Sequence, residues 1–307
     1  MAVTNTLSGP ESLGPGPFQS VLIVVNPISG KGRGKRAARE LREALDQRGI
    51  RAELFETRAR DEAPARLRSL GEPVDLVVAV GGDGTLREVL DGLADRDVPV
   101  GILPFGTSNC LALQLGIPRA VRANLEILLR GKTIALDVMR ANGSLSCLMT
   151  GAGFDARCVR EVELRRRGPI TKWTYVGATL RALRGYRPPR LRVEIDGREL
   201  CATYGQVIVG NAFRYAGIVQ LSRRSRLDDG ELEVYLFPSG SLLEFARAFV
   251  RGILDEMVGS GVELRVGRRV RVFAEGDPEP FQIDGDFGGT TPVEIRLAPT
   301  RYRLVVP

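Results

Sequence analysis

The chain has 307 residues, of which 43% are hydrophobic and 26% charged, a composition typical of a folded soluble protein with one large or two ordinary domains. Lys and Arg outnumber Asp and Glu by 44 to 37, and the resulting net charge of +7 favours contact with phosphates or anionic membranes. The absence of histidine excludes the usual zinc ligand sets and the Ser-His-Asp and Cys-His hydrolase mechanisms, so acid and base chemistry falls mainly to carboxylates.

The first 19 residues are rich in Gly, Pro and Ser and have neither the basic start nor the apolar middle of a signal peptide. We therefore expect a disordered tail at residues 1–19 and a cytoplasmic protein. No apolar run approaches the roughly 20 residues that a membrane-spanning helix needs. The four cysteines form no CxxC pair, and we expect them to be reduced and buried.

Residues 20–136 alternate between strand and helix patterns. The sequence predicts strands at residues 21–26, 52–57, 75–80 and 98–105, with amphipathic segments such as residues 35–49 between them. Continuous apolar strands separated by helices predict a doubly wound α/β domain, in which a parallel sheet is covered on both faces. Ligands of such sheets bind beyond the carboxyl ends of the strands, and three unusual turns follow these ends.

The first turn is the sequence "NPISGKGRGK", residues 26–35, in which three glycines alternate with basic residues. It resembles a P-loop only superficially, because the spacing differs and Arg36 stands where Ser or Thr is required. A phosphate site and a solvated basic loop are both compatible with this segment.

The second turn is Gly-Gly-Asp-Gly-Thr at residues 81–85. Gly81 and Gly82 let the backbone approach a ligand closely, and Thr85 can cap a following helix whose first N–H groups favour phosphate oxygens. A carboxylate at Asp83 is costly beside an anion unless it carries a metal, binds a ribose or donor group, or accepts a proton. The alternative is a tight turn in which Asp83 is only a cap.

The third turn, "PFGTSN" at residues 104–109, ends the next strand. Gly106 makes the turn, and Thr107, Ser108 and Asn109 offer hydroxyl and amide groups ahead of a helix at residues 110–116. Because the second and third turns follow adjacent strands, we expect one shared site.

Residues 137–307 change to alternating strands joined by turns such as Asp196-Gly197 and Asp229-Gly230. Helical segments are expected at residues 171–185 and 242–258. The pattern predicts a second, largely antiparallel domain, whose last strand is able to pack back on the first. The strand-like segments are residues 190–211, 230–237, 261–276 and 291–307.

Seven motifs occur in a fixed order along residues 20–307: "NPISGKG", "AVGGDGTLREVLDGL", "ILPFGTSNCLALQLGIP", "TGAGFDA", "VGNAFRYAG", "SRLDDGELEV" and "QIDGD". In this order the chain resembles the diacylglycerol kinase catalytic family, which includes bacterial lipid kinases and the sphingosine and ceramide kinases. The Gly-Gly-Asp-Gly-Thr motif alone also occurs in NAD kinases and, in related form, in phosphofructokinases.

The resemblance implies a nucleotide-binding α/β domain similar to those of NAD kinases and phosphofructokinases, followed by an antiparallel β-sandwich-like domain. It also implies ATP in the cleft between them, Mg²⁺ and a lipid hydroxyl as acceptor. The residues that match the nucleotide motifs are Asn26, Ser29, Gly30, Lys31, Gly81, Gly82, Gly84, Thr85, Gly106, Thr107 and Asn109. The implied catalytic carboxylates are Asp83, Asp284 and Asp286. The implied metal ligands are Asp284 and Asp286, with Asp229 at an accessory magnesium site.

The residues around the late motif leave two interpretations open. If the segment is extended, Asp284 and Asp286 point to one face and are able to engage one metal. Locally, however, Asp-Gly is also a common hairpin turn. The chain departs from the family at Arg87 and Cys110, which replace Asn and Asp, and at Asp286, where Glu is usual.

A basic stretch at residues 157–190 is interspersed with apolar and aromatic residues. Arg181 and Arg184 share a helix face there, which suits anionic lipid headgroups or an ordinary solvated helix face. No nucleic-acid-binding motif is present. We expect peripheral contact with the inner face of the membrane, and the oligomeric state stays open, a homodimer included.

Phosphoryl transfer requires positioning and charge neutralisation, which glycine turns and aspartates supply without histidine. The sequence therefore predicts an ATP- and Mg²⁺-dependent lipid kinase acting on diacylglycerol or a sphingoid-like acceptor. A soluble NAD kinase-like or other small-molecule kinase is the first alternative. A non-catalytic lipid or nucleotide sensor, suggested by Asp286 and Cys110, is the second.

Overall fold

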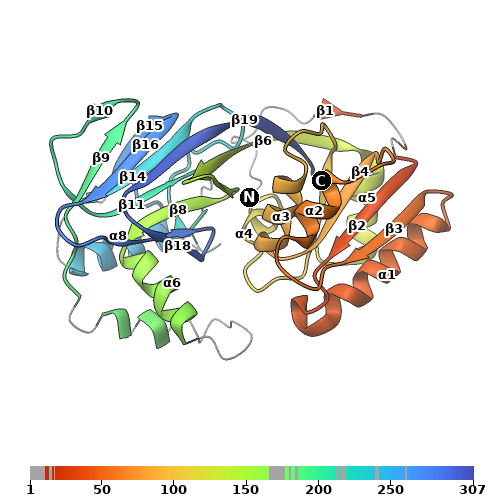
Figure 1. The fold of residues 1–307 in the computed structure, drawn as a ribbon, viewed down its shortest axis with the longest axis horizontal. Coiled ribbons are helices and arrows are strands. Elements are labelled where there is room, and N and C mark those ends of the chain that lie inside the picture. Colours follow the sequence, from red (N-terminus) through yellow and green to blue (C-terminus); the bar gives the residue numbers. More distant parts are fainter. Residues whose placement is uncertain are drawn as a thin grey trace. The chain divides into compact units, whose positions relative to one another are not determined.

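The computed structural model describes residues 11–13, 16, 18–165, 177–179, 181–183, 186–211, 214–215, 219–238, 242–259 and 261–307. The chain falls into two compact units, one formed by Met1–Leu136 with Thr300–Pro307 and the other by Asp137–Pro299 (Figure 1). Most of the tail expected at residues 1–19 lies outside the described residues. Within it, strand β1 (Glu11–Ser12) pairs with the start of β6 (Lys132–Ala141).

The first unit is built on a parallel sheet. Strands β3, β2, β4 and β5 pair in this order, and β19 adds a parallel pairing between Leu304 and Val100. All six residues of β4 are buried, as expected for a strand with helices over both faces of its sheet. The doubly wound α/β fold and its four predicted strands are therefore confirmed. Their bounds are Ser20–Val25 for β2, Arg51–Glu56 for β3, Leu76–Gly81 for β4, Val100–Pro104 for β5 and Val293–Val305 for β19.

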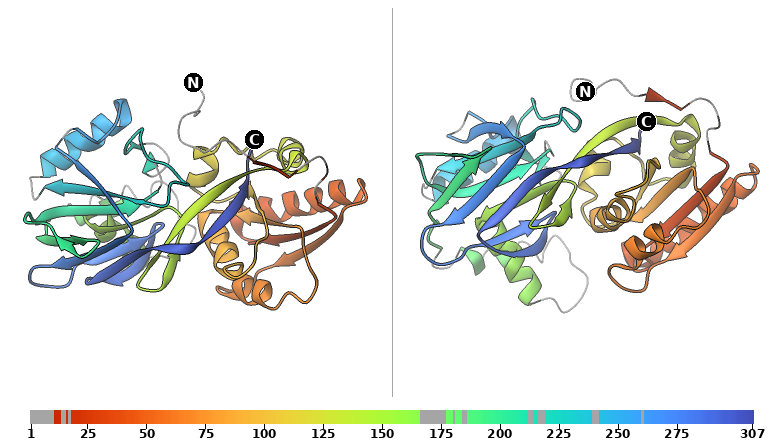
Figure 2. Two further views of the ribbon diagram at one scale, coloured as in Figure 1. Left: turned by 90° about the horizontal axis from the view of Figure 1, so that it is seen from above. Right: turned by 45° about the horizontal axis from the view of Figure 1, so that its top comes forward.

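Helices cover the two faces of this sheet (Figure 2, left). On one face, α1 buries Ala38, Leu41 and Leu45 at helical spacing, in one core with α5 and alternate residues of β2 and β4. Helix α2 packs closely on α3, since a Cβ added at Gly92 would lie 2.8 Å from Leu67 Cβ. The helices are α1 (Arg33–Asp46), α2 (Glu62–Arg68), α3 (Asp83–Gly92), α4 (Cys110–Gln114) and α5 (Val121–Arg130).

The second unit is a β-sandwich of antiparallel strands. One layer pairs in the order β15, β14, β11, β8, β17 and β18, and the other contains β9, β16 and β19. Val193 and Val272 from one layer share a core with Val207 and Phe281 from the other. The predicted antiparallel β-rich fold is confirmed. The strand bounds are β7 Ser144–Ser146, β8 Met149–Gly153, β9 Leu191–Ile195, β10 Arg198–Glu199, β11 Tyr204–Gly210, β12 Arg214–Tyr215, β13 Val219–Gln220, β14 Leu232–Pro238, β15 Glu263–Gly267, β16 Arg269–Ala274, β17 Pro280–Ile283 and β18 Asp286–Thr290.

Helices α6 and α8 belong to this unit. Helix α8 (Leu242–Leu254) contacts β13 and confirms the helix predicted at residues 242–258. Helix α6 (Phe154–Leu164) contacts β8, β17 and β18, and the sequence did not predict it. Most of the helix expected at residues 171–185 lies outside the described residues. Every helix in the described part of the chain is too short or too polar to cross a membrane.

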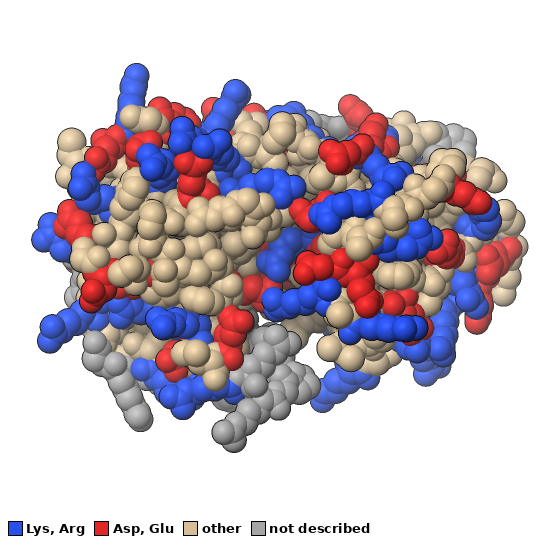
Figure 3. Space-filling view, in the orientation of Figure 1, with Lys and Arg blue, Asp and Glu red and all other residues tan. Residues whose placement is uncertain are grey.

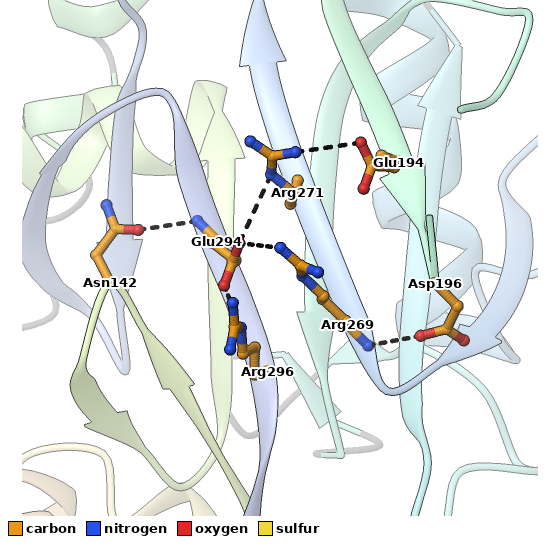
Figure 4. A network of polar contacts seen from close by, with 7 residues as sticks. All are labelled: Asn142, Glu194, Asp196, Arg269, Arg271, Glu294 and Arg296. Atoms are coloured by element: carbon orange, nitrogen blue, oxygen red, sulfur yellow. Dashed lines mark hydrogen bonds and ion pairs between the residues drawn. The ribbon is translucent and has the colours of Figure 1, made fainter. Parts of the chain in front are cut away.

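The outer face of β9, β16 and β19 carries a network of ion pairs (Figure 4). Glu294 lies 2.8 Å from Arg269 and 3.6 Å from Arg271, and it also pairs with Arg296. Arg271 reaches Glu194 on β9 at 3.4 Å. Exposed pairs of this kind contribute little stability individually. Their alternation with apolar inner residues instead specifies which face of these strands is buried.

The cysteines only partly match the prediction. They form no disulfide, and Cys147 and Cys158 are buried. Cys110 is half-buried and Cys201 is exposed, so the prediction of burial was wrong for Cys201, which lies on the connection between β10 and β11.

Candidate functional site

Three loops leave neighbouring strands of the parallel sheet at its carboxyl edge. Loop 1 (residues 26–32) follows β2, loop 2 (residues 81–85) follows β4, and loop 3 (residues 104–109) follows β5. Because β4 lies between β2 and β5 in the sheet, all three loops start side by side. This edge is where parallel α/β sheets bind their ligands.

Loops 2 and 3 contact each other backbone to backbone. The N–H groups of Phe105 and Gly106 both donate to the carbonyl of Gly81, at 2.7 and 3.0 Å. A Cβ added at Gly106 would lie 2.3 Å from the Cα of Gly82. No side chain fits between the two turns, so glycine is required at position 106 for steric reasons.

Loop 1 joins the same cluster. The N–H of Asn26 donates to the carbonyl of Val80 at 3.2 Å, and a Cβ added at Gly30 would lie 3.0 Å from the carbonyl oxygen of Phe105. The structure thus brings together the three turns that the sequence singled out.

The tip of loop 1 has an unusual backbone conformation. Gly30, Lys31 and Gly32 have φ values of 61°, 59° and 83°, which are all left-handed. For Lys31 this conformation costs about 1–2 kcal/mol, and strain of this kind is concentrated at functional sites. Turns that align successive N–H groups form concave anion sites, and the exposed Lys31 adds a positive charge. Ile28, beside the tip, is 78% exposed and was not predicted as a site residue.

Loop 2 begins helix α3 differently from the prediction. The N-cap is Gly82, with extended backbone (φ −101°) and no side-chain cap bond, so the prediction that Thr85 caps this helix was wrong. Thr85 is instead buried in the first turn, and a Cβ at Gly81 would lie 2.3 Å from its hydroxyl oxygen. The first N–H groups of α3 belong to Asp83 and Gly84, and they begin beside loop 3.

Asp83 caps a helix, but not its own. One carboxylate oxygen accepts the N–H of Cys110 at 3.0 Å and the other accepts the N–H of Leu111 at 3.3 Å, at the start of α4. The half-buried carboxylate therefore ties loop 2 to the helix that follows loop 3. Because Cys110 contributes its backbone N–H, this contact does not depend on the side chain at position 110.

Asn109 shapes loop 3. Its side-chain oxygen accepts the N–H of Gly106 at 2.7 Å, and its side-chain nitrogen donates to the carbonyl of the same residue at 2.9 Å. Asn109 is buried and left-handed (φ 50°), a conformation that asparagine tolerates better than most residues. Thr107 and Ser108 are left exposed at the tip of the loop.

In the second unit, the late Asp-Gly-Asp motif is a hairpin turn. Asp284 (φ 50°) and Gly285 (φ 86°) are both left-handed and connect β17 to β18, where Ile283 pairs with Asp286. The premise that both aspartates lie on one extended face was therefore wrong. Asp286, the first residue of β18, is half-buried.

The carboxylate of Asp284 is held by the loop between β7 and β8. One oxygen accepts the Ser146 hydroxyl at 2.7 Å and the N–H groups of Leu148 and Met149 at 3.0 Å each. The other accepts the N–H of Cys147 at 3.0 Å. Asp284 thus anchors the hairpin that presents Asp286. The predicted accessory ligand Asp229 is exposed and accepts the N–H of Glu231 at 3.2 Å.

Comparisons with known proteins agree with this organisation. The model of the diacylglycerol kinase catalytic domain matches residues 20–141, and that of the YegS C-terminal NAD kinase beta sandwich-like domain matches residues 149–306. A diacylglycerol kinase of Mycobacterium tuberculosis is 30% identical over 298 residues, which cover 94% of this chain and 95% of that protein. The chain belongs to the diacylglycerol kinase family. A diacylglycerol kinase of Bacillus subtilis is 26% identical over 290 residues, with 93% and 95% coverage.

Solved structures share the fold. The crystal structure of a diacylglycerol kinase from Bacillus anthracis has a TM-score of 0.72 at 20% identity, covering 94% of this chain and 97% of that one. An NAD kinase from Archaeoglobus fulgidus in complex with ATP has a TM-score of 0.51 at 15% identity, with 93% coverage of each chain. The NAD kinase-like nucleotide-binding domain is thus confirmed as a fold.

This diacylglycerol kinase family member also contains a buried carboxylate that sequence reasoning missed. Asp155, in the first turn of α6, is 4% exposed, and burial raises its pKa from 3.8 to about 6 although hydrogen bonds to the carboxylate oppose the shift. One oxygen accepts the side-chain amide of Gln206 at 2.6 Å and the N–H of Ala156 at 2.7 Å, and the other accepts the amide of Gln282 at 3.2 Å. The only sequence signal is the motif "TGAGFDA", and it does not reveal burial.

Gln282 extends this network to the hairpin turn. Its side-chain oxygen accepts the N–H of Gly285 at 2.7 Å. The motifs "TGAGFDA" and "QIDGD", far apart in sequence, are therefore joined by the chain of bonds from Asp155 through Gln282 to Gly285.

Two further observations concern metal binding and the position of a cavity. The described residues contain no group of three or more Cys, Asp or Glu side chains arranged to hold a metal. A cavity of about 420 Å³ lies at the amino ends of β2 and β3, lined by residues such as Arg51 and Arg66, and shares no residue with the three loops.

Proposed function

We propose that this chain is an ATP- and Mg²⁺-dependent lipid kinase that transfers the γ-phosphate of ATP to a hydroxyl of diacylglycerol or a similar lipid. Membership of the family supports a phosphotransferase with an alcohol acceptor. The observation that carries the proposal is the convergence of the three glycine turns at the carboxyl edge of β2, β4 and β5. Phosphoryl transfer depends mainly on such positioning and on charge neutralisation.

The phosphates of ATP are assigned to loops 1, 2 and 3. The left-handed tip of loop 1 offers backbone N–H groups and Lys31, and α3 offers its N-terminus. The exposed Thr107 offers a hydroxyl. In this assignment Asp83 and Asn109 act by holding the loops in shape, because their side chains bond to backbone groups of the loops and of α4. The ATP complex of an NAD kinase with the same fold supports the choice of nucleotide.

The carboxylates present suit Mg²⁺ unequally. Magnesium in kinases is usually held by one or two carboxylates together with the phosphates of the substrate, so a preformed protein cluster is not needed. Asp284 is a poor direct ligand, because its two oxygens already accept four hydrogen bonds from oxygen and nitrogen donors. Asp286 is the carboxylate that we assign to the metal, and a chemical role of Asp83 beyond holding the loops remains a prediction. Magnesium at Asp229 remains a prediction.

Asp286 is assigned to the acceptor hydroxyl. The Asp284–Gly285 turn holds it at the start of β18, and the bonds to Asp284 and Gly285 fix that turn from two sides. When bound, Mg²⁺ neutralises charge on the phosphates. The protein's own part is then to hold the acceptor hydroxyl and take its proton at the Asp286 carboxylate.

A transfer assay tests the proposal. The protein is incubated with radiolabelled ATP, Mg²⁺ and total lipid extract, and the product is separated into organic and aqueous phases, with the Asp286→Asn variant as control. Label in the organic phase, absent for the variant, is expected. Label on a water-soluble product would favour a small-molecule kinase, and ATP binding without transfer to any lipid would favour a sensor.

A further inference from the structure

We propose that the outer face of α8 docks on the surface of an anionic lipid bilayer. The inference rests on the proposed lipid kinase function, and it names the surface through which the enzyme reaches a substrate held in a membrane. The docking face consists of Ala246, Val250, Ile253 and Leu254, with Arg247 and Arg251 along one side.

The apolar residues of this face are exposed and lie together. Val250 is 55% exposed, Ile253 is 52% exposed and Leu254 is 80% exposed. Positions 246, 250, 253 and 254 share one side of a helix because of their spacing. Eight large hydrophobic residues are exposed in the described part of the chain, and three of them belong to this one helix. Such clustering marks a binding surface more often than scattered exposure does.

The opposite side of α8 explains why this face stays outward. Ala248 is 2% exposed, and a Cβ added at Gly252 would lie 2.4 Å from Val219 and 2.5 Å from Met257. The N–H of Met257 also donates to the carbonyl of Gln220 at 3.0 Å. The helix is therefore fixed to β13 by its small residues, along the outside of the second unit (Figure 2, left).

The charges around α8 suit an anionic surface. Arg247 and Arg251 are exposed, and within the described residues neither forms an ion pair. The acids that follow the helix are engaged by Arg223, which pairs with Asp255 at 2.7 Å and donates its N–H to Glu256 at 2.9 Å. The remaining acid on the helix is Glu244, in its first turn. An apolar stripe bordered by arginine is typical of helices that lie in a membrane interface.

A second copy of the chain fits this face less well. A symmetric dimer through α8 would bring Arg247 and Arg251 of both copies close together, which like-charge repulsion opposes. Three aliphatic side chains also fall short of the roughly 800 Å² per partner that stable interfaces bury. Figure 3 shows one face of the molecule, on which basic and acidic residues are interspersed over much of the area, so that face has no large patch of a single charge sign. The combination of apolar stripe and arginine on α8 is therefore the more specific feature.

The basic stretch expected to meet lipid is less well placed for that role. The Arg181 side chain lies 3.7 Å from Glu161 of α6, and Arg184 lies outside the described residues. The α8 face and this stretch are separable by mutation.

The experiment compares vesicle binding with catalysis in solution. The variants are Val250→Ser/Ile253→Ser/Leu254→Ser and Arg247→Gln/Arg251→Gln, with Val266→Ser on β15 as matched control because Val266 is also 52% exposed. Binding is measured by sedimentation with phosphatidylglycerol and phosphatidylcholine vesicles that contain no acceptor. Turnover is measured on a water-soluble, short-chain diacylglycerol.

The triple serine variant should bind phosphatidylglycerol vesicles roughly tenfold or more weakly, and the arginine variant should lose binding only to the anionic vesicles. Turnover on the short-chain substrate and the melting temperature should be unchanged. Unchanged vesicle binding by both variants would overturn the proposal, as would a wild-type dimer that the triple variant converts to a monomer. If vesicle binding responds as expected but the wild type phosphorylates no lipid, the docking surface stands and the proposed function fails.

Discussion

The side chain of Gln282 donates to the buried carboxylate of Asp155 and accepts the backbone N–H of Gly285, at 3.2 and 2.7 Å. A carboxylate is acceptor-only, so Asp155 fixes which end of the Gln282 amide faces it. The other end is then an oxygen, which is what the N–H of Gly285 requires. A buried charge in α6 thereby sets the geometry of the turn that precedes Asp286.

The Asp155→Asn variant should disturb this turn. The new amide nitrogen would face the donor end of Gln282 or of Gln206, and turning the Gln282 amide over would place a donor against Gly285. We expect turnover to fall about tenfold or more while ATP affinity stays unchanged, because the three loops belong to the other unit. Kinetics and the amide NMR shift of Gly285 test this.

Asp196→Asn is the matched control, because Asp196 accepts backbone N–H groups of Arg268 and Arg269 at an exposed turn of the same unit. It should leave both readouts unchanged. Normal turnover in Asp155→Asn, with an unshifted Gly285 amide, would reduce Asp155 to a packing residue.

Asp155 should also make stability depend on pH. Its pKa is 3.8 ordinarily and about 6 in the fold, because burial disfavours the charged form. The folded state therefore holds this proton more tightly than the unfolded state does. The resulting stabilisation, about 3 kcal/mol, is fully present below pH 4 and is lost as the pH rises through about 6. The free energy of unfolding of Asp155→Asn, measured in urea at pH 5 and pH 8, should rise relative to that of the wild type at the higher pH. If the difference in unfolding free energy between the two proteins is the same at both pH values, the prediction is wrong.

The cap that Asp83 forms on helix α4 should contribute to stability separately from any role of its charge in catalysis. Asp83→Ala removes the acceptor for the N–H groups of Cys110 and Leu111 and should cost about 1–2 kcal/mol of unfolding free energy. Asp83→Asn keeps one acceptor and should cost no more than about 1 kcal/mol, while turnover falls roughly a hundredfold or more if the charge serves the chemistry. Chemical denaturation and transfer assays separate the two effects. Near-normal turnover in Asp83→Asn would leave Asp83 as a cap alone.

Two glycines of the loops make a matched pair. A Cβ at Gly106 would lie 2.3 Å from the Cα of Gly82, whereas a Cβ at Gly84 would meet nothing within 4 Å. Gly106→Ala should therefore cost about 1–3 kcal/mol of stability and weaken ATP binding by separating loops 2 and 3. Gly84→Ala should leave stability unchanged, so a loss of ATP affinity there would indicate that the phosphates approach this turn. Equal melting temperatures for the two variants would contradict the close contact.

The sequence predicted the scaffold better than the contacts within the site. The strands expected at residues 21–26 and 75–80 form at Ser20–Val25 and Leu76–Gly81, because a continuous apolar run admits few alternatives. The hydrogen-bond partners of the site carboxylates could not be predicted from the neighbouring sequence, because they lie far away along the chain. Asp83 binds N–H groups 27 and 28 residues away, and Asp284 binds groups more than 130 residues away.

The burial of Asp155 in helix α6 could not be predicted from the local sequence either. Asp155 stands in the first turn of a helix, where aspartate is common and usually exposed. Its burial arises from packing against β11 and β17, which follow it in sequence by about 50 and 125 residues. Only the tertiary fold reveals that this carboxylate is enclosed.

The last prediction concerns the anchor of the hairpin. Asp284→Ala would leave the N–H groups of Cys147, Leu148 and Met149 without their acceptor, and should cost about 3 kcal/mol of unfolding free energy. Asp286→Asn, one step beyond the turn, is the control and should change stability by less than about 0.5 kcal/mol while abolishing most turnover. If Asp284 acts as an anchor, the loss of activity in Asp284→Asn should be the same at every Mg²⁺ concentration, since the defect lies in the position of Asp286. Recovery of Asp284→Asn turnover at high Mg²⁺, together with wild-type stability of Asp284→Ala, would instead make Asp284 a metal ligand and overturn the anchor.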